Sequence, residues 1–400
     1  MGDSPVVRSI ETLPERFSGS DFPFAARFRL HVGRAVRDVV IDHDSCEVVK
    51  ANGVRPDAEI ITSPETWLEM DEGRVSGIEA FASRRLNVRG SIEKSLLFEP
   101  LFQRPAAGAL SHSIRRIDAG GVKYSVLSAG SPDAEPLLLL HGLGATKSSW
   151  LPIVPALARH HNVIVPDLPG FGASSKPRGR YDARWFSQRL FALMEELGLR
   201  RVVIGGNSMG GRIAQEMAML EPSRVRSIAC LCPVTAFSQR PALWLVRFLR
   251  PELSFFAGRL PRNRIKETLR DLFADSEAIE EEWFEAAVDD FMSVWRSPRA
   301  RLAFSAAARN IYLDEPVGER GFWTRLAVME TPAYYIFGKQ DVLITHDFAK
   351  KVRRTLPNAF VEVWKSCGHV PQIEYPERTA RSLLDFFRRS SSARRSSVSA

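Results

Sequence analysis

A serine between glycines is the first group in this sequence that could do chemistry. Gly206-Asn207-Ser208-Met209-Gly210 has the pattern G-x-S-x-G, with an apolar strand expected before it at 201–205 and a helix expected after it at 209–220. In a tight strand-to-helix turn, small flanking residues allow the serine hydroxyl to project above the sheet. The pattern in this context predicts a nucleophile at Ser208, in preference to a glycine-rich turn with a capping serine.

A serine nucleophile needs a base, and the base needs a carboxylate that orients it. His369 stands in a glycine loop after the last expected strand, and Asp341 follows directly after the strand expected at 333–337. Both positions are carboxyl ends of strands, where open α/β sheets bind their ligands. We therefore predict a catalytic triad of Ser208, Asp341 and His369, with Asp314 and Asp347 as weaker candidates for the acid.

Acyl transfer also needs two N–H donors around the oxygen that becomes negative. The loop at 140–144 follows a strand of four leucines, and its glycines let the backbone turn toward a substrate. We expect the two donors to be the N–H groups of Leu143 and Met209. Asp167 is expected to order its own loop. We expect three residues to support the oxyanion loop: His141, Gly142 and Gly144. The expected role of His141 is to brace this loop.

The elements that must position these groups follow an α/β pattern. Strands are expected at 122–128, 137–141, 162–166, 201–205, 226–232, 333–337 and 359–364, and helices at 183–197, 209–220 and 375–387. Continuous apolar runs such as 137–140 indicate strands buried on both faces, as in a mostly parallel sheet. The predicted fold class is α/β, a doubly wound mostly parallel sheet with a helical cap at about 236–328, preceded by a smaller α+β domain.

Changes of composition divide the chain into five parts. We expect a polar lead-in at 1–26, an α+β domain at 27–104, a linker at 105–112, the α/β domain at 113–388 and a basic disordered tail at 389–400. In the α+β domain, strands are expected at 28–32, 35–41, 47–51, 58–62 and 86–89, and helices at 64–70, 77–83 and 91–102. The cap interval is far too long for a simple connection, and for this reason we assign it as a cap.

The net charge of +8 is not spread evenly along the 400 residues. The segment 236–270 holds eight Lys or Arg and two Glu, and the stretch 386–400 holds four Arg and no acid. This confinement, and the absence of a nucleic-acid-binding motif, argue against a nucleic-acid partner. An apolar helix expected at 241–250, followed by aromatic residues among arginines, fits either a cap packed over the active site or peripheral contact with an anionic membrane surface.

The cysteines and the chain start bear on compartment and cofactors. Cys46, Cys230, Cys232 and Cys367 are too few and too scattered for a disulfide framework, and no set of metal ligands surrounds them. We expect reduced thiols, no metal and no organic cofactor. The start of the chain has no apolar signal-peptide core, and no run is long enough to span a bilayer. The expected location is the cytoplasm, with peripheral membrane association left open.

Five motifs in this order resemble the α/β-hydrolase family over residues 113–388. They are HGLG at 141–144, DLPGFGASSKP at 167–177, GNSMGG at 206–211, GKQD at 338–341 and GHVPQIEYPE at 368–377. The resemblance implies the triad and oxyanion loop given above. A serine at position 208, in the turn between strand and helix, argues against haloalkane dehalogenases and epoxide hydrolases, which resemble this fold but have aspartate at that position. The remaining relatives are esterases, monoacylglycerol-type lipases, meta-cleavage carbon–carbon hydrolases and cofactor-free perhydrolases. The GNSMGG motif does not distinguish among these classes.

A second resemblance covers residues 27–104. The strand at 58–62, then SPETW, the short link GRVS and RRLNVRGS before the last helix are similar to the sterol-carrier-protein-2 family. That family encloses an apolar tunnel for acyl chains or sterols. Residues that could line such a tunnel, or simply form a core, are Trp67, Leu68, Ile78, Phe81, Leu96 and Leu97.

The combined hypothesis is a serine hydrolase that cleaves carboxylic esters of lipid-like substrates, such as monoacylglycerols, through an acyl-enzyme. Carbon–carbon bond hydrolysis of a vinylogous diketone would use the same triad. A lipid-binding or transfer protein with an inactive hydrolase domain is the alternative from another class, although no residue that the chemistry requires is missing. The acyl length, the alcohol group and the oligomeric state stay open.

Overall fold

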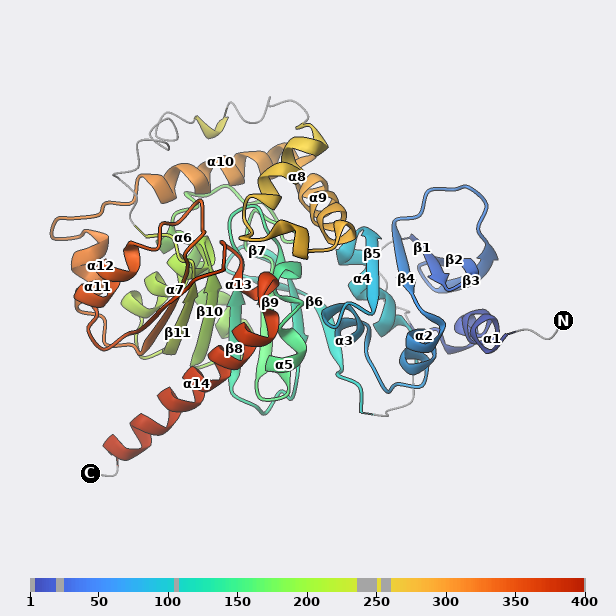
Figure 1. The fold of residues 1–400 in the computed structure, drawn as a ribbon, viewed down its shortest axis with the longest axis horizontal. Helices are drawn as coiled ribbons and strands as arrows, with labels where there is room; N and C mark the ends of the chain where they lie inside the picture. The colour runs from blue at the N-terminus through green and yellow to red at the C-terminus, as the bar shows by residue number, and fades with distance from the viewer. Residues whose placement is uncertain (1–3, 19–24, 104–107, 236–249, 253–259, 399–400) are drawn as a thin grey trace. The chain divides into compact units, whose positions relative to one another are not determined.

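The computed structural model describes residues 4–18, 25–103, 108–235, 250–252 and 260–398 (Figure 1). The chain divides into two compact units. The N-terminal unit holds Met1–Ile114 together with Glu280–Ser293, and the α/β unit holds Arg115–Ile279 together with Val294–Ala400. One stretch of the predicted cap is therefore grouped with the N-terminal unit, although the sequence placed it within the larger domain.

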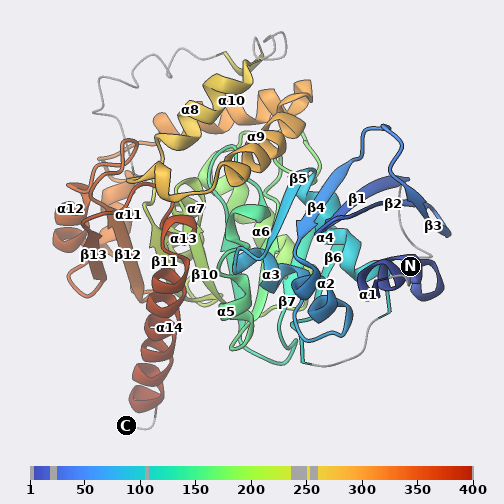
Figure 2. The ribbon, with the colours of Figure 1, turned by 45° about the vertical axis from the view of Figure 1, so that its right-hand side comes forward.

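The N-terminal unit is built on one mixed sheet, seen in blue in Figure 2. Its strands are β1 (Ala26–Val32), β2 (Ala35–Asp42), β3 (Ser45–Lys50), β4 (Ala58–Thr62) and β5 (Leu86–Gly90). They lie in the order β3-β2-β1-β4-β5, and only the β1–β4 pair is parallel among these neighbours. Along β1, buried and half-buried residues alternate, as expected for a strand with one face on a core.

Three short helices of this unit begin at serines. They are α2 (Pro64–Asp71), α3 (Gly77–Ala82) and α4 (Ile92–Phe98). The side chains of Ser63, Ser76 and Ser91 each accept a hydrogen bond from an N–H in the first turn. Such caps satisfy donors that a helix start leaves without a partner. These helices and the five strands lie within a few residues of their predicted positions.

The expectation of a polar lead-in at 1–26 was wrong in one respect. Helix α1 (Pro5–Glu11) forms there, capped by Ser4, and buries Val6 and Ile10 completely or almost completely. The indole N–H of Trp67 donates to the Ser9 hydroxyl at 2.9 Å, which ties α1 to α2. The physical reason is the apolar spacing of Val6 and Ile10, which places both on one face of α1.

The α/β unit contains an eight-stranded sheet, ordered β13-β12-β11-β10-β8-β9-β7-β6. Its strands are β6 (His112–Ala119), β7 (Val122–Ala129), β8 (Pro136–Leu140), β9 (Asn162–Pro166), β10 (Val202–Asn207), β11 (Val225–Leu231), β12 (Ala333–Gly338) and β13 (Phe360–Trp364). The pairs from β9 to β13 are parallel, and β7 joins β9 antiparallel. This is the predicted, mostly parallel α/β sheet. The edge strand β6 begins at the last residue of the predicted linker, and the sequence predicted no strand over its length.

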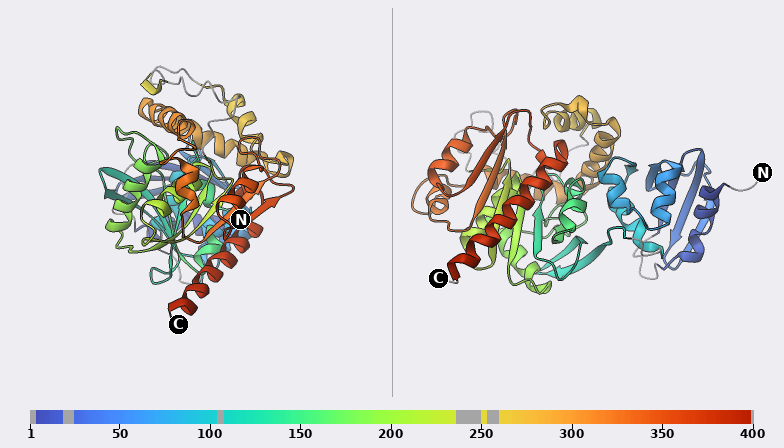
Figure 3. Two further views of the ribbon diagram at one scale, coloured as in Figure 1. Left: turned by 90° about the vertical axis from the view of Figure 1, so that its left-hand side faces the viewer. Right: turned by 60° about the horizontal axis from the view of Figure 1, so that its bottom comes forward.

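Helices cover both faces of this sheet. Helix α7 (Met209–Leu220) contacts β10, β11 and α6 (Ala183–Glu196), whereas α14 (Pro376–Val398) contacts β11 and α5 (Val154–Ala158). Figures 1 and 3 show α14 crossing the face of the sheet opposite to α7. Burial on both faces explains why β8 and β10 have almost no exposed residue.

The described part of the cap interval is mostly helical. It contains α8 (Arg262–Arg270), α9 (Glu281–Trp295), α10 (Pro298–Tyr312) and α11 (Phe322–Ala327). The apolar helix predicted at 241–250 lies almost wholly outside the described residues. Beyond the cap, α12 (Phe348–Thr355) and α13 (Pro371–Glu374) follow β12 and β13. Within the described residues, each helix is too short or too polar to cross a membrane.

The prediction of a disordered tail at 389–400 was wrong for most of its length. Helix α14 continues without a break to Val398. Serine content suggested disorder, but arginine and alanine favour a helix, and no glycine or proline interrupts 377–398.

Candidate active site

Ser208 occupies a strained turn between β10 and α7. Its backbone has φ 54° and ψ −116°, a combination that a non-glycine residue adopts at a cost. The turn is tight because the neighbouring glycines leave no room for a side chain. A Cβ at Gly206 would lie 2.4 Å from the carbonyl oxygen of Gly210, and a Cβ at Gly210 would lie 2.0 Å from that of Leu140. This geometry is that of a nucleophile elbow.

Backbone and amide hydrogen bonds hold the elbow to its neighbours. The Ser208 N–H donates to the Leu231 carbonyl at 2.9 Å, and the Val234 N–H donates to the Ser208 carbonyl at 3.1 Å. The Asn207 side-chain amide donates to Leu231 and to the carbonyl of His369, at 3.1 and 3.0 Å. Asn207 therefore joins the elbow to the loop of the predicted base. The sequence named Asn207 only as part of the motif.

Asp341 and His369 form a buried pair. His369 Nδ1 lies 2.7 Å from Asp341 Oδ2, and the two side chains are 5% and 0% exposed. The other carboxylate oxygen accepts the N–H groups of Leu343 and Ile344 at 2.8 and 2.9 Å. With Nδ1 donating to a carboxylate, the imidazole keeps Nε2 as its acceptor, which is the tautomer that a general base for serine requires.

The pair forms because β12 and β13 are parallel neighbours whose carboxyl ends meet at one edge of the sheet. The Gln340 N–H donates to the Cys367 carbonyl at 3.0 Å. A Cβ at Gly338 would lie 2.0 Å from the Gly368 carbonyl oxygen, so the loops of acid and base touch where a glycine is required. The prediction from chain order thus placed Asp341 and His369 where the structure brings them together.

Glu374 anchors the His369 loop, a role that the sequence analysis missed. Its carboxylate accepts the N–H of Gly368 at 2.7 Å and that of Ala274 at 2.9 Å. The His369 N–H donates to the Leu272 carbonyl at 2.6 Å. Burial raises the pKa of Glu374 above its ordinary value, against the hydrogen bonds that favour the carboxylate. A signal existed, since an acid stands five residues after the histidine on the short helix α13.

His141 braces the predicted oxyanion loop. Its Nδ1 lies 2.8 Å from the Gly142 carbonyl, and its Nε2 accepts the Leu168 N–H at 2.9 Å. Burial lowers the pKa of His141, so the ring is neutral, with the proton on Nδ1. A Cβ at Gly142 would lie 3.3 Å from the Ser208 Cβ, so the loop runs directly beside the serine. These contacts agree with a bracing role for His141.

The two predicted oxyanion donors belong to the helix start after Ser208 and to the turn beside it. Met209 is the first residue of α7, and N–H groups in the first turn of a helix have no partner within that helix. Leu143 follows Gly142 in the turn that lies against Ser208. Gly144 has φ 75°, a conformation that glycine adopts without cost, and it lets the chain leave this turn.

A buried ion pair fixes the end of the same loop. Lys147 Nζ lies 2.8 Å from Asp167 Oδ2 and 3.1 Å from the Ser125 hydroxyl, and both charged side chains are 1% exposed. Asp167 also accepts the N–H groups of Lys147 and Ala173, each at 2.8 Å. Asp167 orders its loop as expected. The participation of Lys147 was not predicted, because lysine is mostly a surface residue.

The two weaker candidates for the acid lie elsewhere. Asp314 accepts a hydrogen bond from Arg212 Nε at 2.6 Å, and Arg212 also pairs with buried Glu216. Asp347 is exposed and pairs with Lys350 at 3.3 Å. The ring nitrogen of His369 pairs with Asp341 instead of with either of these two carboxylates.

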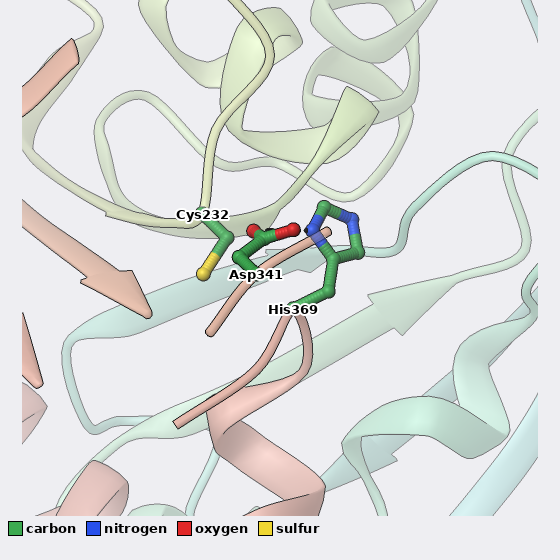
Figure 4. Close-up of side chains that lie close together, drawn as sticks. All are labelled: Cys232, Asp341 and His369. Atoms are coloured by element: carbon green, nitrogen blue, oxygen red, sulfur yellow. Dashed lines mark hydrogen bonds and ion pairs between the residues drawn. The ribbon is translucent and has the colours of Figure 1, made fainter. Parts of the chain in front are cut away.

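Cys232 lies against the acid–base pair, and Figure 4 shows the Asp341 carboxylate between the Cys232 and His369 side chains. Cys232, Asp341 and His369 each place one atom that could bind a metal within 4.8 Å of the corresponding atoms of the other two. A metal there would have to displace the proton that His369 and Asp341 share. Burial raises the pKa of the Cys232 thiol well above its ordinary value, so the thiol is protonated. The arrangement therefore suits an acid–base pair with a neutral thiol beside it.

Comparison with known proteins identifies both parts of the chain. The model of the alpha/beta hydrolase fold family matches residues 135–376, and that of the SCP-2 sterol transfer family matches residues 23–103. The dihydrolipoyllysine-residue acetyltransferase component of the acetoin cleaving system of Pseudomonas putida is 28% identical over 69% of this chain and 69% of its own. Lipase 1 of Psychrobacter immobilis is 28% identical over 67% of this chain and 81% of its own.

Carbon–carbon hydrolase names also occur among the relatives. The 2-hydroxy-6-oxononadienedioate/2-hydroxy-6-oxononatrienedioate hydrolase 1 of Dechloromonas aromatica is 28% identical over 63% of this chain and 86% of its own. Among solved structures, a bacterial membrane phospholipase A described as a virulence factor superposes with a TM-score of 0.58 and 26% identity, over 70% of this chain and 87% of its own. Since the matching family model spans more than half of the sequence, this chain belongs to the alpha/beta hydrolase fold family.

Proposed function

We propose that the chain is a serine hydrolase that cleaves carboxylic esters of lipid-like substrates, such as monoacylglycerols or related acyl esters. The observation that carries the proposal is the strained elbow at Ser208 together with the buried His369–Asp341 pair at 2.7 Å. Strain of this kind persists in a protein when the surrounding structure holds it for a function.

The proposed reaction follows from these positions. His369 Nε2 takes the proton of the Ser208 hydroxyl, and the hydroxyl oxygen attacks the ester carbonyl carbon. The N–H groups of Leu143 and Met209 stabilise the negative oxygen of the tetrahedral intermediate. His369 then gives its proton to the departing alcohol, which leaves an acyl-enzyme. Water activated by His369 attacks that ester and releases the acid, and Asp341 stabilises the imidazolium in both steps.

Two findings support a lipid-like substrate. Residues 23–103 match a sterol transfer family, and relatives of the α/β unit include a lipase and a solved phospholipase A. The predicted tunnel residues Trp67, Ile78 and Leu96 are buried in the N-terminal unit, as either a core or an apolar ligand site requires. Contact with an anionic membrane surface is part of the same proposal, although most of the segment that suggested it lies outside the described residues.

The test is steady-state hydrolysis of nitrophenyl esters over a series of acyl lengths, with wild type and Ser208→Ala side by side. We expect turnover to rise with acyl length and to fall on the order of a millionfold in the variant, because the triad works as a unit. Unchanged turnover in Ser208→Ala would remove Ser208 from the reaction. Ser208-dependent turnover that is limited to the shortest acyl chains would argue against a lipid ester.

Carbon–carbon bond hydrolysis is the second candidate, favoured by the relative from Dechloromonas aromatica. It would use the same triad, and it predicts turnover of a 2-hydroxy-6-oxo-dienoate with no preference for long acyl esters. Measuring both substrates with one enzyme preparation distinguishes the two reactions. Activity on neither, with retained binding of a fluorescent acyl lipid by the full chain, would favour a lipid-binding or transfer protein instead.

A further inference from the structure

The chain that follows α8 lies against the backbone of the predicted base. The His369 N–H donates to the Leu272 carbonyl at 2.6 Å. A Cβ at Gly368 would lie 2.2 Å from the Leu272 carbonyl oxygen and 2.9 Å from the Ala274 nitrogen. The two segments therefore touch through backbone atoms, at a place where a side chain would not fit. We call residues 272–274 the strap.

The strap continues the last turn of α8. The Leu272 N–H donates to the Leu269 carbonyl at 3.2 Å, and the Phe273 N–H donates to the Arg270 carbonyl at 3.1 Å. Both ends of this unit are held by burial, since Ile265 on α8 and Phe273 in the strap are each less than a tenth exposed. A displacement of α8 is therefore passed to the strap.

Glu374 joins the strap to the loop of the base. One carboxylate oxygen accepts the Ala274 N–H at 2.9 Å, and the other accepts the Gly368 N–H at 2.7 Å. Hydrogen bonds to an ionised carboxylate are stronger than neutral ones. A neutral amide could not replace both, because one of its two polar groups is a donor. The bridge between the two segments therefore needs a carboxylate at this position.

We propose that the strap positions His369 according to the place of α8, and that Glu374 is the positioning residue that couples the two. The proposal rests on the triad of the proposed function. Helix α8 belongs to the predicted cap, so a substrate that displaces α8 also displaces the Leu272 carbonyl and the main chain of His369. Substrate binding under the cap is thereby linked to the chemistry at Ser208.

The main chain of His369 matters because its ring has two tasks. Nδ1 is bonded to Asp341 at 2.7 Å, and Nε2 must reach the Ser208 hydroxyl at the same time. A displacement of about 1 Å can cost about a hundredfold in rate. Releasing one of the contacts that hold the loop should cost part of this, about tenfold in kcat. KM should change by less than about twofold, because the residues of α8 are kept.

The experiment compares full-length wild type with Glu374→Gln by ester kinetics and by hydrogen exchange followed by mass spectrometry. The glutamine leaves one of the two backbone N–H groups without an acceptor. We expect exchange in peptides covering 272–275 and 366–371 to become faster by about fivefold or more, because local opening is easier. Unchanged exchange, or faster exchange with unchanged kcat, would overturn the proposal.

A second variant tests whether Glu374 acts through the strap. Ala274→Pro removes the N–H that the carboxylate accepts on the strap side. If both changes break one contact, the double variant should lose little more kcat than Glu374→Gln alone. Losses that multiply would mean that Glu374 acts through Gly368 only, and they would refute the coupling to α8.

The matched control is Asp182→Ala. Asp182 also accepts a backbone N–H, that of Trp185 at 2.8 Å, but it caps the start of α6. Loss of this cap should lower stability. It should leave both kcat and exchange at 366–371 unchanged. A kcat loss as large as that of Glu374→Gln would show that general destabilisation, and not the strap, explains the effect.

Hydrogen exchange also separates this proposal from the proposed function. It needs no turnover, so a wild type without ester activity would refute the proposed function while exchange still decides whether the strap holds the loop. Conversely, ester turnover that depends on Ser208, together with unchanged exchange in Glu374→Gln, would leave the proposed function intact and refute the strap. Circular dichroism of each variant shows that the fold is kept.

Discussion

Replacing Lys147 by Met tests whether the buried ion pair supports the oxyanion loop. The change removes the ammonium from a site that is 1% exposed and leaves the Asp167 carboxylate buried without its charge partner. Breaking a buried pair costs about 3–5 kcal/mol. Two backbone N–H groups still bond to Asp167 at 2.8 Å, so we expect the lower end, about 3 kcal/mol.

The pH dependence of that loss gives a sharper test. Burial by itself raises the pKa of Asp167, but the charge of Lys147, its hydrogen bonds and neighbouring His141 together more than offset burial and hold the pKa below its ordinary value. The pair therefore stabilises the wild type above the unfolded-state pKa of about 3.9, and this contribution is lost as pH falls through the lower folded-state pKa. In Lys147→Met, burial dominates and raises the folded-state pKa. The loss of unfolding free energy in Lys147→Met is then largest near neutral pH and becomes smaller as pH falls.

The assay is urea unfolding of the full chain at neutral and mildly acidic pH, followed by tryptophan fluorescence. Trp150, fully buried at the end of the turn that Lys147 begins, reports on this region. Lys123→Met, at an exposed lysine of β7, is the matched control and should change the unfolding free energy by less than about 0.5 kcal/mol. A Lys147→Met penalty that is equally small, or that grows as pH falls, would refute the reasoning.

Two further substitutions test the elbow and the N-terminal helix. Gly210→Ala should abolish ester turnover or folding, because the new Cβ would lie 2.0 Å from the Leu140 carbonyl oxygen. The control is Gly198→Ala, whose new Cβ has no atom within 4 Å and which should cost only about 1 kcal/mol for its positive φ. Both variants are measured by ester turnover and by urea unfolding. Ile10→Ala should destabilise the N-terminal unit by about 3 kcal/mol, because Ile10 is fully buried. Hydrogen exchange of β1 and β2 would show this loss, and unchanged protection would mean that α1 does not stabilise the sheet.

Local signals predicted most of the fold. The bounds of α7 and β4 match the prediction, because α7 starts at a glycine-flanked turn and β4 is closed by Ser63 and Pro64. The errors came from judging segments by composition. The polar start of the chain hid the helical spacing of Val6 and Ile10, and the serine-rich end hid a continuous helix. Strand β6 was missed because, as an edge strand, it is charged and half exposed.

The grouping of Glu280–Ser293 with the N-terminal unit could not be predicted from the sequence. Periodicity predicts that a segment is helical and which of its faces is apolar. It carries no information on which surface that face covers, because that depends on contacts between residues far apart in the chain. The same limit applies to Asn207 and Lys147, since each bonds to groups distant in sequence.

Three side chains outside the triad contact the loop that carries His369, and the sequence motifs do not indicate these contacts. Asn207 donates to the carbonyl of His369, Glu374 accepts the N–H of Gly368, and Cys232 lies at the carbonyl of Gly368. All three contact the backbone of one loop, so the position of the base is set from β10, α13 and the end of β11 at once. A displacement of the base by about 1 Å can cost about a hundredfold in rate. Changes at these three positions should therefore lower kcat more than they raise KM, because each contact holds the loop that carries the base.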